Sequence, residues 1–232
     1  MKILAIDSSA VSASCALSEN ETVLASEFAN NGLTHSQTLM PMVEKVLAQS
    51  KTDIQNVDLF AVTNGPGSFT GVRIGVAALK GLAFAGDKPC LGFSTLELIA
   101  AGVKEPDCIV ISCMDARREQ IYTATFESVS LKRMTPDEAI PAASLAGRIH
   151  SYQKKVILAG DGARLTYSIL KESCPEIALA DEDALYQNAK NLCSLAFQKS
   201  KHAKSGDVLV PTYLRLSQAE RELRKKRNEA LS

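Results

Sequence analysis

The sequence predicts an α/β fold that is built twice, as two subdomains that each hold a mixed β-sheet flanked by helices. Three observations lead to this prediction. Short strand-like runs alternate with segments of helical periodicity along the chain. A glycine-rich stretch, residues 64–71, joins one such strand to a long apolar helix. The order strand, Asp turn, strand, helix, strand, Gly turn, helix also occurs once in each half.

In the first half the elements follow from apolar runs and their punctuation. The polar turn 19–21 predicts an antiparallel meander, and Thr34 is a plausible N-cap for the helix that follows. Pro41 lies early in that helix and could make its start irregular. The predicted strands are 3–6, 14–17, 22–28, 58–63 and 90–93, and the predicted helices are 35–49, 68–85 and 95–101.

In the second half the same order returns more loosely. The predicted strands are 108–113, 121–126, 130–134 and 156–159, and the predicted helices are 142–150, 164–171 and a closing helix 184–200. A repeated unit of this kind is the plan of the actin, sugar-kinase and Hsp70 superfamily, in which the Asp and Gly turns of both halves face one cleft. We therefore divide the chain into an N-terminal subdomain (1–103), a C-terminal subdomain (104–215) and a mixed-charge tail (216–232).

Composition limits the class of protein. The formal net charge is zero, which argues against a chain-wide nucleic-acid footprint, and 46% of the residues are hydrophobic, which suffices for a sizeable core. The apolar run at the N-terminus ends at Asp7, too early for a signal peptide, and no run approaches membrane-spanning length. The six cysteines show no C-x-x-C spacing, so we expect reduced core thiols in a cytoplasmic protein.

The glycine-rich stretch has two interpretations. A strand-to-helix junction with Gly65, Pro66 and Gly67 could present a helix N-terminus to an anion. It could also be a tight turn that lets strand and helix pack closely, and the missing Gly-Lys-Ser/Thr ending favours this second interpretation.

Groups for catalysis are sparse. No pair of histidines has metal-ligand spacing, and the serine of residues 67–71 is not placed as in a nucleophile elbow. Two turns could hold hydrated magnesium and phosphate, but carboxylates that hydrogen-bond turn amides are the favoured interpretation. These turns define a candidate vestigial nucleotide cleft, which consists of Asp7, Ser8, Ser9, Gly160, Asp161 and Gly162.

The helix 68–85 is apolar almost all round, with Arg73 and Lys80 as its only charges. Gly71, Gly75 and Ala78 form a stripe of small residues. A helix of this kind is covered on most sides, either by its own domain or by a partner protein, and the pattern alone does not decide between the two.

The chain resembles the bacterial TsaB family, also called YeaZ. The resemblance is carried by the whole stretch 61–75 around the glycine loop, by residues 6–9, by residues 115–118 with Tyr122, and by Pro211, Tyr213, Leu214 and Arg215. It runs from end to end and implies the actin-like duplicated fold. It also implies a role in making threonylcarbamoyl-adenosine, the modified base beside the anticodon of tRNAs that read codons starting with A.

In that pathway the resemblance implies that the catalyst is the paralogue TsaD, which carries a metal-binding His-x-x-x-His helix. Here Thr95 and Ile99 stand where the two histidines would fall, and neither side chain can replace an imidazole. We therefore expect a non-catalytic accessory subunit with no cofactor of its own, with metal and ATP held by partner subunits. An independent ATP-dependent small-molecule kinase of the same fold is the alternative.

The resemblance further implies association through helices 35–49 and 68–85. The expected partners are TsaD, the ATPase TsaE, and a second copy of the chain when TsaD is absent, with tRNA contacted only indirectly or weakly and no membrane involved. The candidate interface residues are Leu39, Met42, Val43, Val46, Phe69, Val72, Arg73, Val76, Leu79 and Lys80.

Overall fold

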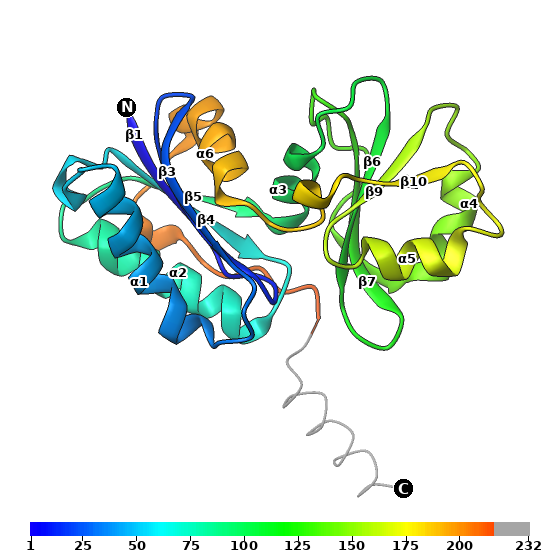
Figure 1. Cartoon of the computed structure of the whole chain (residues 1–232), viewed down its shortest axis with the longest axis horizontal. Helices are drawn as coiled ribbons and strands as arrows, with labels where there is room; N and C mark the ends of the chain where they lie inside the picture. Colours follow the sequence, from blue (N-terminus) through cyan, green and yellow to red (C-terminus); the bar gives the residue numbers. More distant parts are fainter. Residues whose placement is uncertain (216–232) are drawn as a thin grey trace, which may run out of the picture.

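The computed structural model describes residues 1–215 and shows two halves side by side, each built on a five-stranded sheet (Figure 1). The strand order is β3-β2-β1-β4-β5 in the first sheet and β8-β7-β6-β9-β10 in the second. In both sheets the central strand, β1 or β6, pairs antiparallel with the next strand of the chain and parallel with the third one beyond it. The two sheets therefore have one topology, and the predicted duplicated α/β fold is confirmed.

The strands lie where hydrophobic runs and polar turns place them. Those of the first sheet are β1 (Lys2–Asp7), β2 (Ala13–Glu19), β3 (Thr22–Ala29), β4 (Leu59–Gly65) and β5 (Cys90–Ser94). Those of the second are β6 (Ile109–Asp115), β7 (Gln120–Glu127), β8 (Glu138–Pro141), β9 (Val156–Ala159) and β10 (Ile177–Leu179). β1 and β6 are almost wholly buried, as expected for strands covered on both faces.

Helices cover both faces of the first sheet. α1 (His35–Gln49) and α2 (Phe69–Phe84) pack on one face, and α6 (Ala189–Gln198) packs on the other (Figure 1). On the second sheet, α4 (Ala146–Ile149) and α5 (Ala163–Leu170) cover one face.

Helix α3 (Thr95–Gly102) lies between the two halves and belongs to both cores. Leu98 and Ala101 pack against the first sheet, whereas Leu96 and Ile99 pack against the second. Apolar residues on opposite sides of one short helix thus join the two sheets.

Two predicted elements were wrong in position. The third strand of the second sheet is β8, not 130–134, because the backbone at Val129 and Leu131 has positive φ and forms a turn there. The closing helix begins at Ala189 and not at 184, since Asn188 caps it and a short 3₁₀ turn ends at Ala184. The short strand β10 was not predicted.

The closing helix also differs in its partner. α6 follows the second sheet in sequence, within the predicted C-terminal subdomain 104–215, yet it packs on β1 and β2 of the first sheet. Leu192 and Leu195 are buried there, and the Cys193 thiol lies 3.7 Å from the Ile3 carbonyl oxygen. Within residues 1–198 the chain therefore crosses from the first half to the second and back again.

All six cysteines are free and buried, as the sequence predicted. Within residues 1–215, no helix combines the length and the apolar character needed to cross a membrane. The predicted tail 216–232 lies outside the described residues.

Candidate functional site: a cleft between the two halves

The turn after β1 is closed on itself. The Asp7 carboxyl is fully buried, and its Oδ1 accepts hydrogen bonds from Ser9 Oγ at 2.6 Å, from Ser9 N at 3.4 Å and from Thr63 Oγ1. Burial raises the pKa of Asp7, and these hydrogen bonds partly oppose the shift. Asp7 Oδ1 therefore bonds its own turn and strand β4, whereas Oδ2 is buried without a hydrogen-bond partner among the described residues.

The glycine loop packs directly on this turn. A Cβ on Gly67 would lie 2.2 Å from the Ser9 carbonyl oxygen, and one on Gly71 would lie 2.1 Å from that of Ser8. The Ser68 N–H donates to Ser9 O at 2.7 Å, and the Ser68 hydroxyl caps α2 by accepting from Gly71 N. Close packing thus explains these glycines, and it occupies the Ser68 and Gly71 amides that an anion would need.

Residues 210–215, called the strap here, run across the glycine loop. Thr212 N donates to the Asn64 carbonyl at 2.6 Å, and Gly65 leaves room for Thr212, whose carbonyl oxygen would lie 2.2 Å from a Cβ there. At its far end Arg215 donates to the Ala116 carbonyl at 2.7 Å, which belongs to the second half. The strap therefore ties the halves together.

Within the strap, Tyr213 is held by the start of α2. Its ring stacks on Phe69 with centroids 4.6 Å apart, and its hydroxyl accepts from Arg73 Nε at 2.8 Å. The Arg73 guanidinium also lies 3.8 Å from the Phe69 ring centroid. Phe69 and Arg73, predicted to face a partner, thus contact the chain's own strap.

A cavity of about 420 Å³ remains between the halves and the strap. Of the six predicted cleft residues, Ser9 and Asp161 line it, whereas the other four do not. Its lining residues are Ser9, Ala10, Val11, Gly67, Ser68, Phe69, Met114, Asp115, Ala116, Arg117, Tyr122, Asp161, Thr212, Tyr213, Leu214 and Arg215.

Asp161 is the perturbed carboxyl of this cavity. Burial raises its pKa to about 6, and the negative charges of Asp115 and Asp7 add to the shift. Gln187 Nε2 donates to Asp161 at 3.4 Å and opposes it. Sequence reasoning missed Gln187, which is fully buried and also accepts from Ser12 Oγ across the junction.

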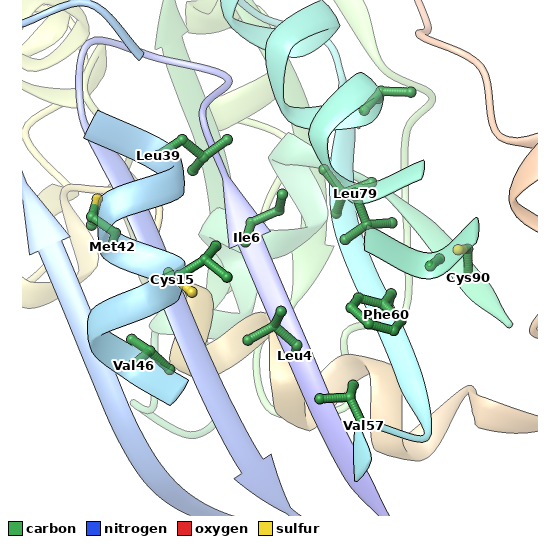
Figure 2. Close-up of a cluster of buried hydrophobic side chains, with 14 of the residues drawn as sticks. Leu4, Ile6, Cys15, Leu39, Met42, Val46, Val57, Phe60, Leu79 and Cys90 are labelled. Atoms are coloured by element: carbon green, nitrogen blue, oxygen red, sulfur yellow. The ribbon is translucent and has the colours of Figure 1, made fainter. Parts of the chain in front are cut away.

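Most of the candidate interface residues are buried within the chain itself. Seven of them are at most 8% exposed and form the core between the first sheet and its two helices (Figure 2). They are Leu39, Met42, Val43, Val46, Val72, Val76 and Leu79. Lys80, the remaining residue of the set besides Phe69 and Arg73, donates to the carbonyls of Asp207 and Leu209.

The outer face of α2, defined here by Thr70, Ala77, Gly81 and Phe84, is exposed instead. Phe84 stands out because 84% of its surface is accessible. In the predicted stripe of small residues, Gly71 and Gly75 face Ser8 and Ala78 packs partly buried against the core. Gly81, which was not part of that stripe, has open space beside it.

The positions where two metal-binding histidines were considered are buried inside the chain. Thr95 and Ile99 are 0% and 1% exposed at one side of α3. The Ile99 side chain reaches the second half, where it would lie 3.1 Å from a Cβ on Gly160. Among the described residues, one group of metal-binding side chains is compact enough for an ion, and it lies outside the cleft.

Comparison with known proteins gives the family. A family model described as tRNA N6-adenosine threonylcarbamoyltransferase, TsaD, matches residues 23–223. The chain is 33% identical to the tRNA threonylcarbamoyladenosine biosynthesis protein TsaB of Bacillus subtilis, over 95% of this chain and 96% of that one.

Solved structures give the same relationship. YeaZ from Pseudomonas aeruginosa superimposes with a TM-score of 0.76 at 26% identity, covering 92% of this chain and 99% of that one. A candidate N-acetylmannosamine kinase from Listeria monocytogenes superimposes with a TM-score of 0.51 at 12% identity, over 87% of this chain and 100% of that one, and shares only the fold.

Proposed function

The chain belongs to the TsaB family of tRNA threonylcarbamoyladenosine biosynthesis proteins, and we propose that it acts there as a non-catalytic accessory subunit. It supports transfer of the threonylcarbamoyl group to the adenosine beside the anticodon of tRNAs that read A-starting codons. It does so by forming a heterodimer with TsaD, to which TsaE binds. Metal and ATP are held by these partner subunits.

One observation carries this proposal: the parts of the cleft that would do chemistry are used for packing. Asp7 is bonded by Ser9 and Thr63, the glycine loop is filled by the Ser8–Ser9 turn, and Ile99 fills the junction beside Gly160. A nucleotide phosphate would have to displace the chain's own backbone from the loop. These contacts favour the accessory subunit over the kinase.

The outer face of α2 is the surface that we assign to TsaD, or to a second copy of the chain when TsaD is absent. Ala77 and Gly81 let another helix approach closely, and Phe84 offers a large apolar side chain at the end of the same face. The buried residues behind this face support it but do not contact the partner.

The first test is reconstitution of threonylcarbamoyl transfer to tRNA. The reaction contains TsaD, TsaE and the threonylcarbamoyl-adenylate donor, with or without this chain. We expect product only when the chain is present. Equal product without it would refute the accessory role. Tight ATP binding by the isolated chain, lost in Asp161→Asn, would instead support the kinase.

The second test concerns the surface. Ala77→Glu places a carboxylate at the centre of the outer face of α2 without touching the core. An unpaired charge in an interface costs about 3 kcal/mol or more, so TsaD affinity is expected to fall at least about a hundredfold. Binding measured by calorimetry checks this.

Ala143→Glu is the matched control, since it makes the same change at an exposed helical position of the second half. It should bind TsaD as the unchanged chain does. Val76→Glu is unsuitable, because Val76 is only 4% exposed and a buried charge there would unfold the protein. Normal TsaD binding by Ala77→Glu would disprove the assigned surface while leaving the accessory role open.

A further inference from the structure

Three metal-binding side chains meet on the second half, away from the cleft. His150 caps the C-terminal end of α4, and Cys174 and Glu176 follow the C-terminal end of α5. One donor atom from each residue lies within 4.8 Å of the other two. The cleft lies at the opposite end of α5, an eight-residue helix about 12 Å long.

The contacts among the three residues are specific. His150 Nε2 lies 3.7 Å from the Cys174 thiol sulfur, and His150 Nδ1 lies 3.2 Å from a Glu176 carboxylate oxygen. Tetrahedral zinc, with bonds of about 2.3 Å to sulfur and about 2.1 Å to nitrogen, separates these two ligand atoms by about 3.6 Å. The sulfur and the imidazole are thus already spaced as two ligands of one ion.

Burial divides the roles of the three side chains. Cys174 is fully buried in the core of the second half and is fixed by a hydrogen bond from its N–H to Leu170 O at 2.8 Å. The side chains of His150 and Glu176 are 52% and 39% exposed. Both can therefore turn toward an ion that enters from solvent, while the sulfur stays in place.

The donor set determines the class of ion. Thiolate and imidazole are ligands for zinc and its neighbours in the transition series, whereas magnesium and calcium prefer oxygen alone. Three protein ligands leave a fourth position for water.

We propose that His150, Cys174 and Glu176 form a binding site for a zinc-class divalent cation, which ties the end of α4 to the end of α5. The three ligands come from two segments that are 24 residues apart in sequence. Binding therefore links the two ends of a segment that contains β9 and α5, and it stabilises the second half without involving the cleft.

The test uses the full, untagged chain titrated with Co²⁺, which reports thiolate ligation by a charge-transfer absorption band, followed by displacement with Zn²⁺. We expect one ion per chain, the charge-transfer band, and a rise in melting temperature with Zn²⁺. His150→Gln, Cys174→Ser and Glu176→Gln should each lower affinity at least tenfold, and Cys174→Ser should abolish the band.

The controls make the same changes elsewhere. His202→Gln removes another exposed imidazole, Glu172→Gln removes a neighbouring exposed carboxylate, and Cys90→Ser removes another buried thiol. All three should bind as the unchanged chain does. If Co²⁺ gives no band, or if His150→Gln and Glu176→Gln fold and bind unchanged, the site does not exist as proposed.

Discussion

Asp161 is the cleft residue whose protonation is coupled to folding. Its pKa is about 6 in the folded chain, against about 3.9 for an ordinary aspartate. The folded state therefore holds the proton more tightly, so this group makes the chain less stable as the pH rises from about 4 to about 6. Above that range, the buried charge lowers the free energy of unfolding by the full amount, about 2 to 3 kcal/mol.

Asp161→Asn removes this cost and keeps an oxygen that accepts from Gln187. We expect the variant to exceed the unchanged chain in free energy of unfolding by about 2 kcal/mol at pH 7.5, and to match it near pH 4. Urea unfolding at both pH values checks the prediction. The exposed Asp183→Asn is the control and should change stability by less than about 0.5 kcal/mol. A variant less stable than the parent at pH 7.5 would contradict it.

The sequence correctly predicted that Asp7 and Asp161 lie in turns, because strand ends and neighbouring glycines mark such turns. It could not separate Asp7, which is buried behind the cavity and bonded through Oδ1, from the cavity-lining Asp161. That difference depends on Thr63, which is 56 residues away from Asp7. Nothing in the sequence identified Gln187 as a residue of the site, because it lies in a segment without a motif or periodic pattern.

Two of the three glycines in helix α2, Gly71 and Gly81, have opposite surroundings, and this contrast gives a test at the scale of the element. Gly71→Ala would drive a methyl group into the Ser8 carbonyl, which is backbone and cannot turn aside. We expect a loss of about 2 to 3 kcal/mol in the free energy of unfolding. Gly81→Ala meets nothing within 4 Å and should stabilise the chain by up to about 1 kcal/mol.

Chemical denaturation of both variants measures the two effects in one helix. Similar changes in both would show that helix propensity alone governs these positions and that the contact with the Ser8 turn is unimportant. The sequence predicted the existence and nearly the bounds of α2. It could not predict which face of the helix is buried, because an almost uniformly apolar helix has no distinct apolar side. In the structure Val72, Val76 and Leu79 face the sheet.

The returning helix α6 makes the first half dependent on the end of the chain. Leu192 and Leu195 cover one face of the first sheet, so the predicted subdomain 1–103 lacks part of its own core. We expect a 1–103 fragment to bind hydrophobic dyes and to unfold without a cooperative transition.

A fusion that joins residues 185–215 to this fragment through a flexible linker is the matched control, and it should regain cooperative unfolding. Cooperative unfolding of 1–103 alone would contradict the prediction. The duplicated topology was predictable because each half repeats its turns and strands in order. The crossing of α6 was not, since its amphipathic pattern suits either sheet equally well.

Helix α3 has a mechanical consequence for the whole molecule. Its side chains are shared by two hydrophobic cores, with Leu98 in one and Leu96 and Ile99 in the other. Two halves joined only by a flexible linker could open at a hinge. Here, any opening requires close-packed side chains of α3 to slide past their neighbours. The two halves are therefore expected to move only by small shear displacements. A partner protein would then bind them as one nearly rigid unit.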